Sequence, residues 1–177
     1  MSEPFLIKHM SSGRFFHPES GKNNPRDNTE IVLHSDIHAH MRWKFVRVHD
    51  NWGYIQHVAS GKIIHPLGGS LCSGNETGLV LHNDRHQGAP FSLDACNHHV
   101  IHKGGKFAHP QGGSPCAGDG TKVVLHSDVT RYDSINGRKG GREVGRKEGR
   151  KEGREGGRKV GRKVPSMDAC KSERKNS

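Results

Sequence analysis

A histidine–aspartate motif recurs in the sequence, and its residue types could bind either a metal ion or the hydroxyl groups of a sugar. The motif is complete as HSDIH (residues 34–38) and HNDRH (residues 82–86). It recurs as HSDVT (residues 126–130), where threonine replaces the final histidine. Imidazole and carboxylate groups are common metal ligands. A carboxylate can also accept hydrogen bonds from two neighbouring hydroxyls, while an imidazole can donate or accept.

A second motif, His-Pro followed by glycine, accompanies each copy of the first. It reads HPESG (residues 17–21), HPLGG (residues 65–69) and HPQGG (residues 109–113), and its histidine always lies 17 residues before the first histidine of the other motif. Because glycine lets the backbone approach a ligand closely, this motif favours sugar binding over metal binding. A structural role as a turn and a strand end is the third alternative, and three copies at one spacing make it less favoured.

Short β-strands must position these motifs, because apolar and polar residues alternate in short runs bounded by Gly, Pro, Asn and Asp. The motifs recur at intervals of 48 and 44 residues, which indicates an internal triplication. Three four-strand units predict an all-β fold, a β-trefoil, in which a closed barrel is capped by three hairpins. Residues i and i+2 of a strand share a face, so Asp36 and His38 are expected on the same side as His34. The predicted strands lie near residues 5–10, 14–18, 30–36, 42–49, 53–58, 62–66, 79–84, 90–95, 99–103, 106–110 and 122–128.

The composition changes near residue 137. Residues 1–137 hold 13 Lys and Arg against 12 Asp and Glu, whereas residues 138–177 hold 15 against 6 and are dominated by Gly, Arg, Lys and Glu. Such a segment cannot bury an apolar core, so we expect a disordered basic tail. The third copy continues as RYDSINGRKGG, so its last strand is expected to be missing or replaced. The predicted division is a trefoil domain over residues 1–136, with repeats at about 5–50, 51–97 and 98–136, followed by a tail over 137–177.

Several function classes find little support in the sequence. No serine–histidine–aspartate set, catalytic carboxylate pair or phosphate-binding loop stands out, so we do not expect an enzyme. The basic tail could bind nucleic acid or another polyanion, and this is the alternative function. Because the tail contains no aromatic residues to stack on bases, however, we do not expect nucleic acid as a partner. There is no signal-peptide pattern and no apolar run of about 18 residues, so we expect a cytoplasmic or non-classically secreted protein without membrane insertion.

The two motifs, together with WGYIQHVASGKIIHPLGG (residues 52–69), resemble the galactose-binding β-trefoil lectins of mussels, the mytilectin family. The resemblance extends from about Phe5 to Asp128. It implies binding of galactose and N-acetylgalactosamine, including α-galactosides such as globotriose, without a metal or cofactor. The implied partners are galactose-containing glycans and glycolipids, and agglutination of cells or microbes would follow. The positions of an aromatic pair that joins some relatives into dimers match Ala95 and Cys96, which leaves monomer and homodimer open.

The resemblance also implies one sugar site per repeat. Each site would use the histidine and a glycine of HPxGG, the aspartate and last histidine of HxDxH, and an asparagine in the loop between them. The second copy matches throughout, with His65, Gly68, Asn75, Asp84 and His86. The first offers His17, Gly21, Asp27, Asp36 and His38, with Ser20 in place of the first glycine. The third offers His109, Gly112, Asp119 and Asp128, with Thr130 in place of the last histidine. We therefore rank the sites second, first, third.

Overall fold

A computed structural model of the chain describes residues 3–94, 96–128 and 135–139. The Cα positions separate into two units, Met1–Gly140 and Gly141–Ser177. The second unit lies outside the described residues, and so does most of the predicted tail. The disorder of the tail therefore stays a prediction.

Each repeat of the first unit contributes four β-strands, as the triplication predicts. The first repeat contains β1 (Phe5–His9), β2 (Phe15–Pro18), β3 (Thr29–His34) and β4 (Trp43–His49). The second contains β5 (Trp52–His57), β6 (Ile63–Pro66), β7 (Thr77–His82) and β8 (Phe91–Asp94). The third contains β9 (His99–His102), β10 (Phe107–Pro110), β11 (Val123–His126) and β12 (Ile135–Lys139). Two single 3-10 turns interrupt the loops, η1 (Ala39–Met41) and η2 (Gln111–Gly113).

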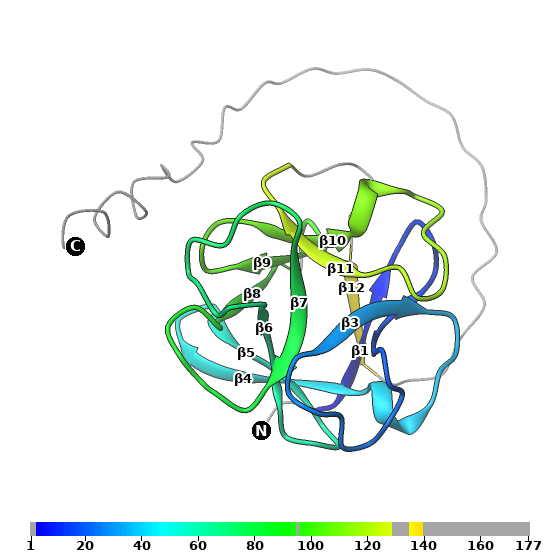
Figure 1. Cartoon of the computed structure of the whole chain (residues 1–177), viewed down its shortest axis with the longest axis horizontal. Helices are drawn as coiled ribbons and strands as arrows, with labels where there is room; N and C mark the ends of the chain where they lie inside the picture. The colour runs from blue at the N-terminus through cyan, green and yellow to red at the C-terminus, as the bar shows by residue number, and fades with distance from the viewer. Residues whose placement is uncertain (1–2, 95, 129–134, 140–177) are drawn as a thin grey trace. The chain divides into compact units, whose positions relative to one another are not determined.

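The strands form a barrel and a cap of three hairpins. In the barrel, β1 pairs with β4, β4 with β5, β5 with β8 and β8 with β9. The hairpins β2–β3, β6–β7 and β10–β11 form the cap, and β7 pairs with both β3 and β11 (Figure 1). This arrangement is the predicted β-trefoil, and it places the turns of the hairpins at the outer ends of the cap.

The core is built from the apolar residues of the alternating pattern. Strand β1 shows this alternation directly, since Phe5, Ile7 and His9 are buried while the residues between them are partly exposed. Trp43 begins β4 at the centre of the core, and its indole N–H donates a hydrogen bond of 3.3 Å to the carbonyl oxygen of Phe16. Among the largest fully buried side chains are Trp43, Phe16, Phe91, Ile7, Ile31, Leu33, Met41, Ile55, Ile64, Leu79 and Leu81.

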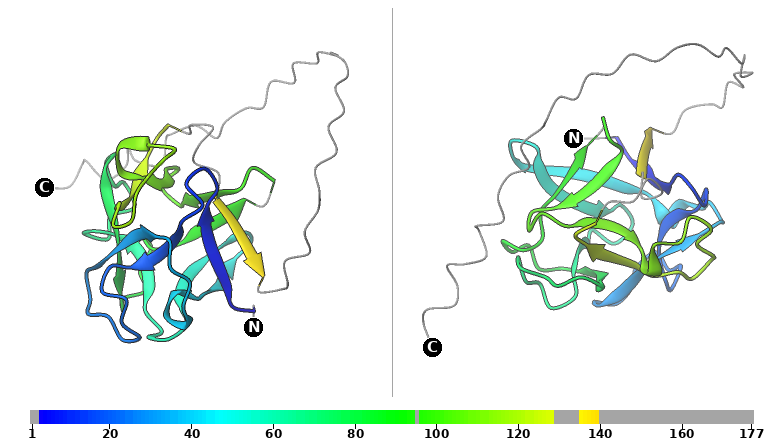
Figure 2. Two further views of the ribbon diagram at one scale, coloured as in Figure 1. Left: turned by 90° about the vertical axis from the view of Figure 1, so that its right-hand side faces the viewer. Right: turned by 90° about the horizontal axis from the view of Figure 1, so that it is seen from above.

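The last strand is replaced rather than missing. Strand β12, with the sequence INGRK, pairs antiparallel with β1 from Phe5 opposite Lys139 to His9 opposite Ile135. In Figure 2 it lies in yellow beside the blue β1. Residues 137–139, which the sequence analysis assigned to the tail, thus belong to the barrel. The prediction misplaced them because it followed apolar side chains, whereas a ladder is formed by backbone N–H and C=O groups.

Candidate functional site

The HxDxH motifs form turns at the ends of strands, and the prediction that they share one strand face is wrong. Strands β3, β7 and β11 end at the first histidine of the motif, so the aspartate lies beyond the strand. Nδ1 of each first histidine accepts the aspartate's backbone N–H, at 3.2 Å for Asp36 and 3.1 Å for both Asp84 and Asp128. This local bond competes with further strand pairing. The three carboxylates consequently point to solvent, with 75%, 75% and 81% of their side chains exposed.

The His-Pro histidines lie at the ends of β2, β6 and β10, and all three are buried. Nδ1 of His17 lies 2.6 Å from the carbonyl oxygen of Pro18, and Nδ1 of His65 lies 2.7 Å from that of Pro66. A carbonyl only accepts hydrogen bonds, so Nδ1 carries the hydrogen in each ring. Burial lowers the pKa of both histidines, which favours the neutral form. In that form Nε2 is an acceptor.

In the second copy this acceptor has no partner among the residues that the structure describes. Nε2 of His65 is buried and makes no hydrogen bond with any residue that the structure describes. The ring of His86 lies 5.2 Å away, centroid to centroid, in a T-shaped arrangement. Nδ1 of His86 accepts the N–H of Gly88 at 3.2 Å, so neutral His86 carries its hydrogen on Nε2. A hydrogen-bond acceptor on His65 and a donor on His86 therefore lie on neighbouring rings.

Glycines give this second copy its shape. A Cβ atom at Gly69 would lie 2.7 Å from Nε2 of His86, so only glycine leaves room for that ring. Gly68 has a φ of +83° and would place a Cβ within 4 Å of no other atom. The backbone at Gly68 is consequently open on the side where another residue would carry its side chain.

In the first copy the two ring nitrogens satisfy each other. Nε2 of His17 lies 2.6 Å from Nε2 of His38, and Nδ1 of His38 accepts the N–H of His40 at 3.2 Å. His38 therefore donates to His17. Ser20, which stands where the other copies have a glycine, is not among the described residues with positive φ, although Gly21 has a φ of +60°. A ligand at this copy would have to displace an existing hydrogen bond.

The third copy is only partly described. The rings of His109 and His126 lie 5.0 Å apart, and Gly112 has a φ of +77° with no atom within 4 Å of an added Cβ. These features resemble those of the second copy. Thr130, and with it the consequence of losing the last histidine, lies outside the described residues.

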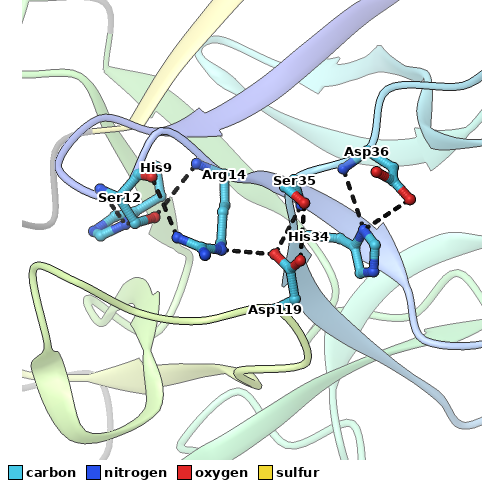
Figure 3. A network of polar contacts seen from close by, with 7 residues as sticks. All are labelled: His9, Ser12, Arg14, His34, Ser35, Asp36 and Asp119. Carbon is cyan, nitrogen blue, oxygen red and sulfur yellow. Dashed lines mark hydrogen bonds and ion pairs between the residues drawn. The ribbon is translucent and has the colours of Figure 1, made fainter.

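The loop residues lie in a different place from the one predicted, because each contacts the motif of the following repeat. Oδ1 of Asp119 accepts the N–H of Ser35 at 2.9 Å, and Oδ2 accepts its hydroxyl at 2.8 Å (Figure 3). Oδ1 of Asn75 accepts the N–H of Ser127 at 3.0 Å. Asp27 lies 3.8 Å from Nε2 of His82.

Each loop residue contacts the following repeat because the hairpins pair with one another in the cap. The N–H of Asn28 donates to Leu81, that of Glu76 to Leu125 and that of Gly120 to Leu33, so each loop is bonded to the next strand of the cap. The structure therefore groups each loop residue with the motifs of the following repeat, whereas the resemblance implies one from the same repeat. The first group contains His17, Gly21, Asp36, His38 and Asp119. The second contains His65, Gly68, Asp84, His86 and Asp27. The third contains His109, Gly112, Asp128 and Asn75.

Residues 5–135 match the MytiLec family, which is described as alpha-D-galactose-binding lectin. The chain belongs to this family. A galactose-binding lectin of Crenomytilus grayanus is 57% identical over 51 residues, which are 29% of this chain and 34% of the relative. An alpha-D-galactose-binding lectin of Mytilus galloprovincialis is 55% identical over 51 residues, 29% of this chain and 27% of the relative. The matched segment thus spans about a third or less of these curated relatives.

Solved structures support the fold that we assign to this MytiLec chain. The designed threefold-symmetric protein ThreeFoil matches with a TM-score of 0.65 at 14% identity, over 76% of this chain and 96% of its own. The C-terminal half of the earthworm R-type lectin, solved with GalNAc, matches with a TM-score of 0.57 at 10% identity, over 76% and 97%. At these identities the likeness shows the fold alone.

Two negative findings apply to the part of the MytiLec chain that the structure describes. Within residues 3–94, 96–128 and 135–139, no group of three or more His, Cys, Asp or Glu is arranged to hold a metal ion. Among the same residues no helix is long and apolar enough to cross a membrane.

A second set of histidines, which the sequence analysis missed, holds the loops that follow the HxDxH motifs. Nε2 of His57 donates to the carbonyl oxygen of His40 at 2.6 Å, and Nε2 of His102 donates to that of Gly88 at 2.7 Å. Both side chains are fully buried, and each holds the loop that follows the last histidine of the preceding repeat. The signal was present in the sequence, since His9, His57 and His102 precede the three His-Pro histidines by eight, eight and seven residues.

We predict that the fold loses stability as the pH falls below about 6.5, the ordinary pKa of histidine. Burial lowers the pKa of four histidines, His17, His57, His65 and His102. As the pH falls, the unfolded chain therefore binds protons at these positions at a higher pH than the folded chain does. The contribution of these histidines to the free energy of unfolding is therefore fully present above their unfolded pKa. It decreases as the pH falls below that value and levels off below their folded pKa.

Thermal denaturation at pH 8, 7, 6 and 5 would measure this effect. We expect the midpoint to fall by at least about 4 °C between pH 8 and 5, which corresponds to roughly 1 kcal/mol. A midpoint that stays constant or rises toward pH 5 would contradict the prediction.

Proposed function

We propose that this chain is a metal-independent lectin that binds terminal galactose or N-acetylgalactosamine, with its strongest site at the second group. Membership of the MytiLec family supports the class of ligand. The observation that carries the proposal is the buried Nε2 of His65, which has no hydrogen-bond partner among the described residues. A buried polar atom without a partner is unfavourable, so a polar ligand that reaches it would gain binding energy.

A sugar hydroxyl has the chemistry that this group requires. It can donate to Nε2 of His65 and accept from Nε2 of His86, because a hydroxyl does both at once. The exposed carboxylate of Asp84 can accept from two further hydroxyls. The open backbone at Gly68 allows the sugar ring to approach closely. We infer that a polyhydroxylated ligand binds without a metal ion and without a catalytic step.

The three groups differ in what a ligand must displace, which supports the ranking second, first, third. At the first group the ligand must break the bond between His17 and His38. At the third, threonine replaces the last histidine of the motif. Several weak sites on one molecule raise the avidity for a multivalent surface by roughly 10² to 10⁴. Agglutination of cells or microbes that display α-galactosides, including globotriose, is part of this proposal.

The proposed function predicts that the full chain is retained on galactose-agarose in the presence of EDTA and is eluted by free galactose. Glucose at the same concentration is the control and should not elute it. Elution by salt alone, together with equal retention on heparin-agarose, would instead indicate polyanion binding through the basic segment after residue 137. Flow-through at neutral pH by a chain with a cooperative unfolding transition would contradict the proposal.

A further inference from the structure

Three basic residues occupy equivalent positions in the repeats and contact the loop residues that join one repeat to the next. Arg14, Lys62 and Lys106 each lie three residues before the His-Pro histidine. Nε of Arg14 donates to Asp119 at 2.6 Å, and Nζ of Lys106 donates to Asn75 at 2.8 Å. Nζ of Lys62 donates to Oδ1 of Asp27. The same contact is therefore built three times, always between a basic residue of one repeat and the loop of the preceding repeat in cyclic order.

Each contact continues into the carboxylate that we propose as a sugar ligand. Figure 3 shows the first case, in which Arg14 bonds Asp119, Asp119 bonds both polar groups of Ser35, and Asp36 follows Ser35 in the turn. The turn is closed by His34, whose Nδ1 accepts the N–H of Asp36.

The other two junctions also connect a loop residue to the following motif, the second through the first histidine and the third, like the first, through a serine. At the second, Asp27 lies beside His82, whose Nδ1 accepts the N–H of Asp84. At the third, Asn75 bonds Ser127, whose hydroxyl lies 3.3 Å from Oδ1 of Asp128. A basic residue is thus connected through a loop residue to the motif aspartate in all three repeats.

The second junction is the most strongly constrained. Only 9% of the Lys62 side chain is exposed, and burying an ammonium group is costly unless it is paired. Its partner Asp27 stands where Asn75 stands in the second repeat, so this junction pairs a cation with a carboxylate. The hydrogen bond from Lys62 is the main cause that lowers the pKa of Asp27. Asp27 therefore stays ionised and acts only as a hydrogen-bond acceptor.

We propose that Arg14, Lys62 and Lys106 are positioning residues, which hold the loop of the preceding repeat so that each motif aspartate is oriented for sugar binding. This role rests on the proposed lectin function. In this view the affinity of each site depends on a contact between repeats as well as on the residues that touch the sugar. This view also gives the buried ammonium group of Lys62 a role beside the second site.

The test is a galactose titration of the isotope-labelled full chain, followed by NMR at the backbone amides of Asp84 and Asp36. In Lys62→Met, which keeps most of the side-chain volume, the affinity reported by Asp84 should fall at least fivefold while that reported by Asp36 stays within twofold. Lys62→Arg should restore the affinity at Asp84. Lys103→Met, at an exposed lysine outside the junctions, is the matched control and should change neither signal.

Two outcomes would overturn the positioning role. One is an affinity at Asp84 that stays within twofold of the parent chain in Lys62→Met. The other is an equal loss at Asp84 and Asp36, which would show a general effect on the fold. Should Lys62→Met fail to fold, Lys106→Met tests the same role at the third junction through the amide of Asp128, since its partner there is a neutral amide.

A failure of the lectin proposal gives a different result. The parent chain would then show no galactose-dependent shift at Asp36, Asp84 or Asp128. The positioning role would still be judged without sugar, since Lys62→Met should move the amide signal of Asp84 and raise the titration midpoint of the Asp27 carboxyl. An unchanged Asp84 signal would overturn it.

Discussion

A chain that ends after residue 134 should be less stable than the full chain by several kcal/mol, because it lacks β12. This strand pairs with β1 over five residue pairs. Each backbone hydrogen bond contributes about 1 kcal/mol net, and the total stability of a domain is only about 5–15 kcal/mol. Removing β12 also leaves the edge of β1 unpaired, and an unpaired edge promotes aggregation.

The matched control is a chain that ends after residue 140, which keeps β12 and removes only the second unit. We expect its denaturation midpoint to lie within about 2 °C of the full chain, because a polar segment contributes little burial. Urea denaturation and light scattering of the three chains would measure stability and aggregation. Equal midpoints for the chains ending at 134 and 140 would show that INGRK contributes nothing to the barrel.

The substitution Asp84→Ala should lower the galactose affinity of the second site by at least about tenfold. A hydrogen bond to a charged group contributes about 1.5–3 kcal/mol, and 1.4 kcal/mol corresponds to a factor of ten in affinity. Because 75% of the Asp84 side chain is exposed, the thermal midpoint should change by less than about 2 °C. Binding and stability are thus expected to separate at this position.

Calorimetric titration with galactose, alongside a thermal melt, would measure both quantities. Asp36→Ala should reduce the total binding less than Asp84→Ala, because the ligand at the first group competes with the bond between His17 and His38. Glu3→Ala removes an exposed acidic side chain outside the three groups and is the control. A larger loss from Asp36→Ala than from Asp84→Ala would reverse the proposed ranking of the sites.

Much of the fold was predictable because the sequence repeats. The motif that begins at His34 recurs at His82 and His126, and the described strands lie within a few residues of the predicted ones. Alternation of apolar residues determines which face of a strand is buried, and it depends only on local order along the chain. The HPxGG glycines were likewise predictable, since Gly68, Gly69, Gly112 and Gly113 all adopt positive φ.

Local patterns could not show where the motif aspartates point or which loop accompanies them. Asp84 leaves the strand because its own backbone N–H bonds His82, a bond that competes with strand pairing. Asn75 lies 52 residues from Ser127 in the sequence, and only the pairing of β7 with β11 brings them together. The resemblance implied a loop residue from the same repeat, whereas these contacts join each loop residue to the motif of the following repeat.

The sequence by itself determined the triplication, the β-trefoil and the residue types of the three groups, because these follow from periodicity and composition. The tertiary structure alone decided that each group draws on two repeats, that a basic residue joins them, and that the polar segment INGRK completes the pairing of β1. The physical reason is that these features depend on backbone pairing and on charges brought together across the cap. Neither leaves a periodic pattern of apolar side chains.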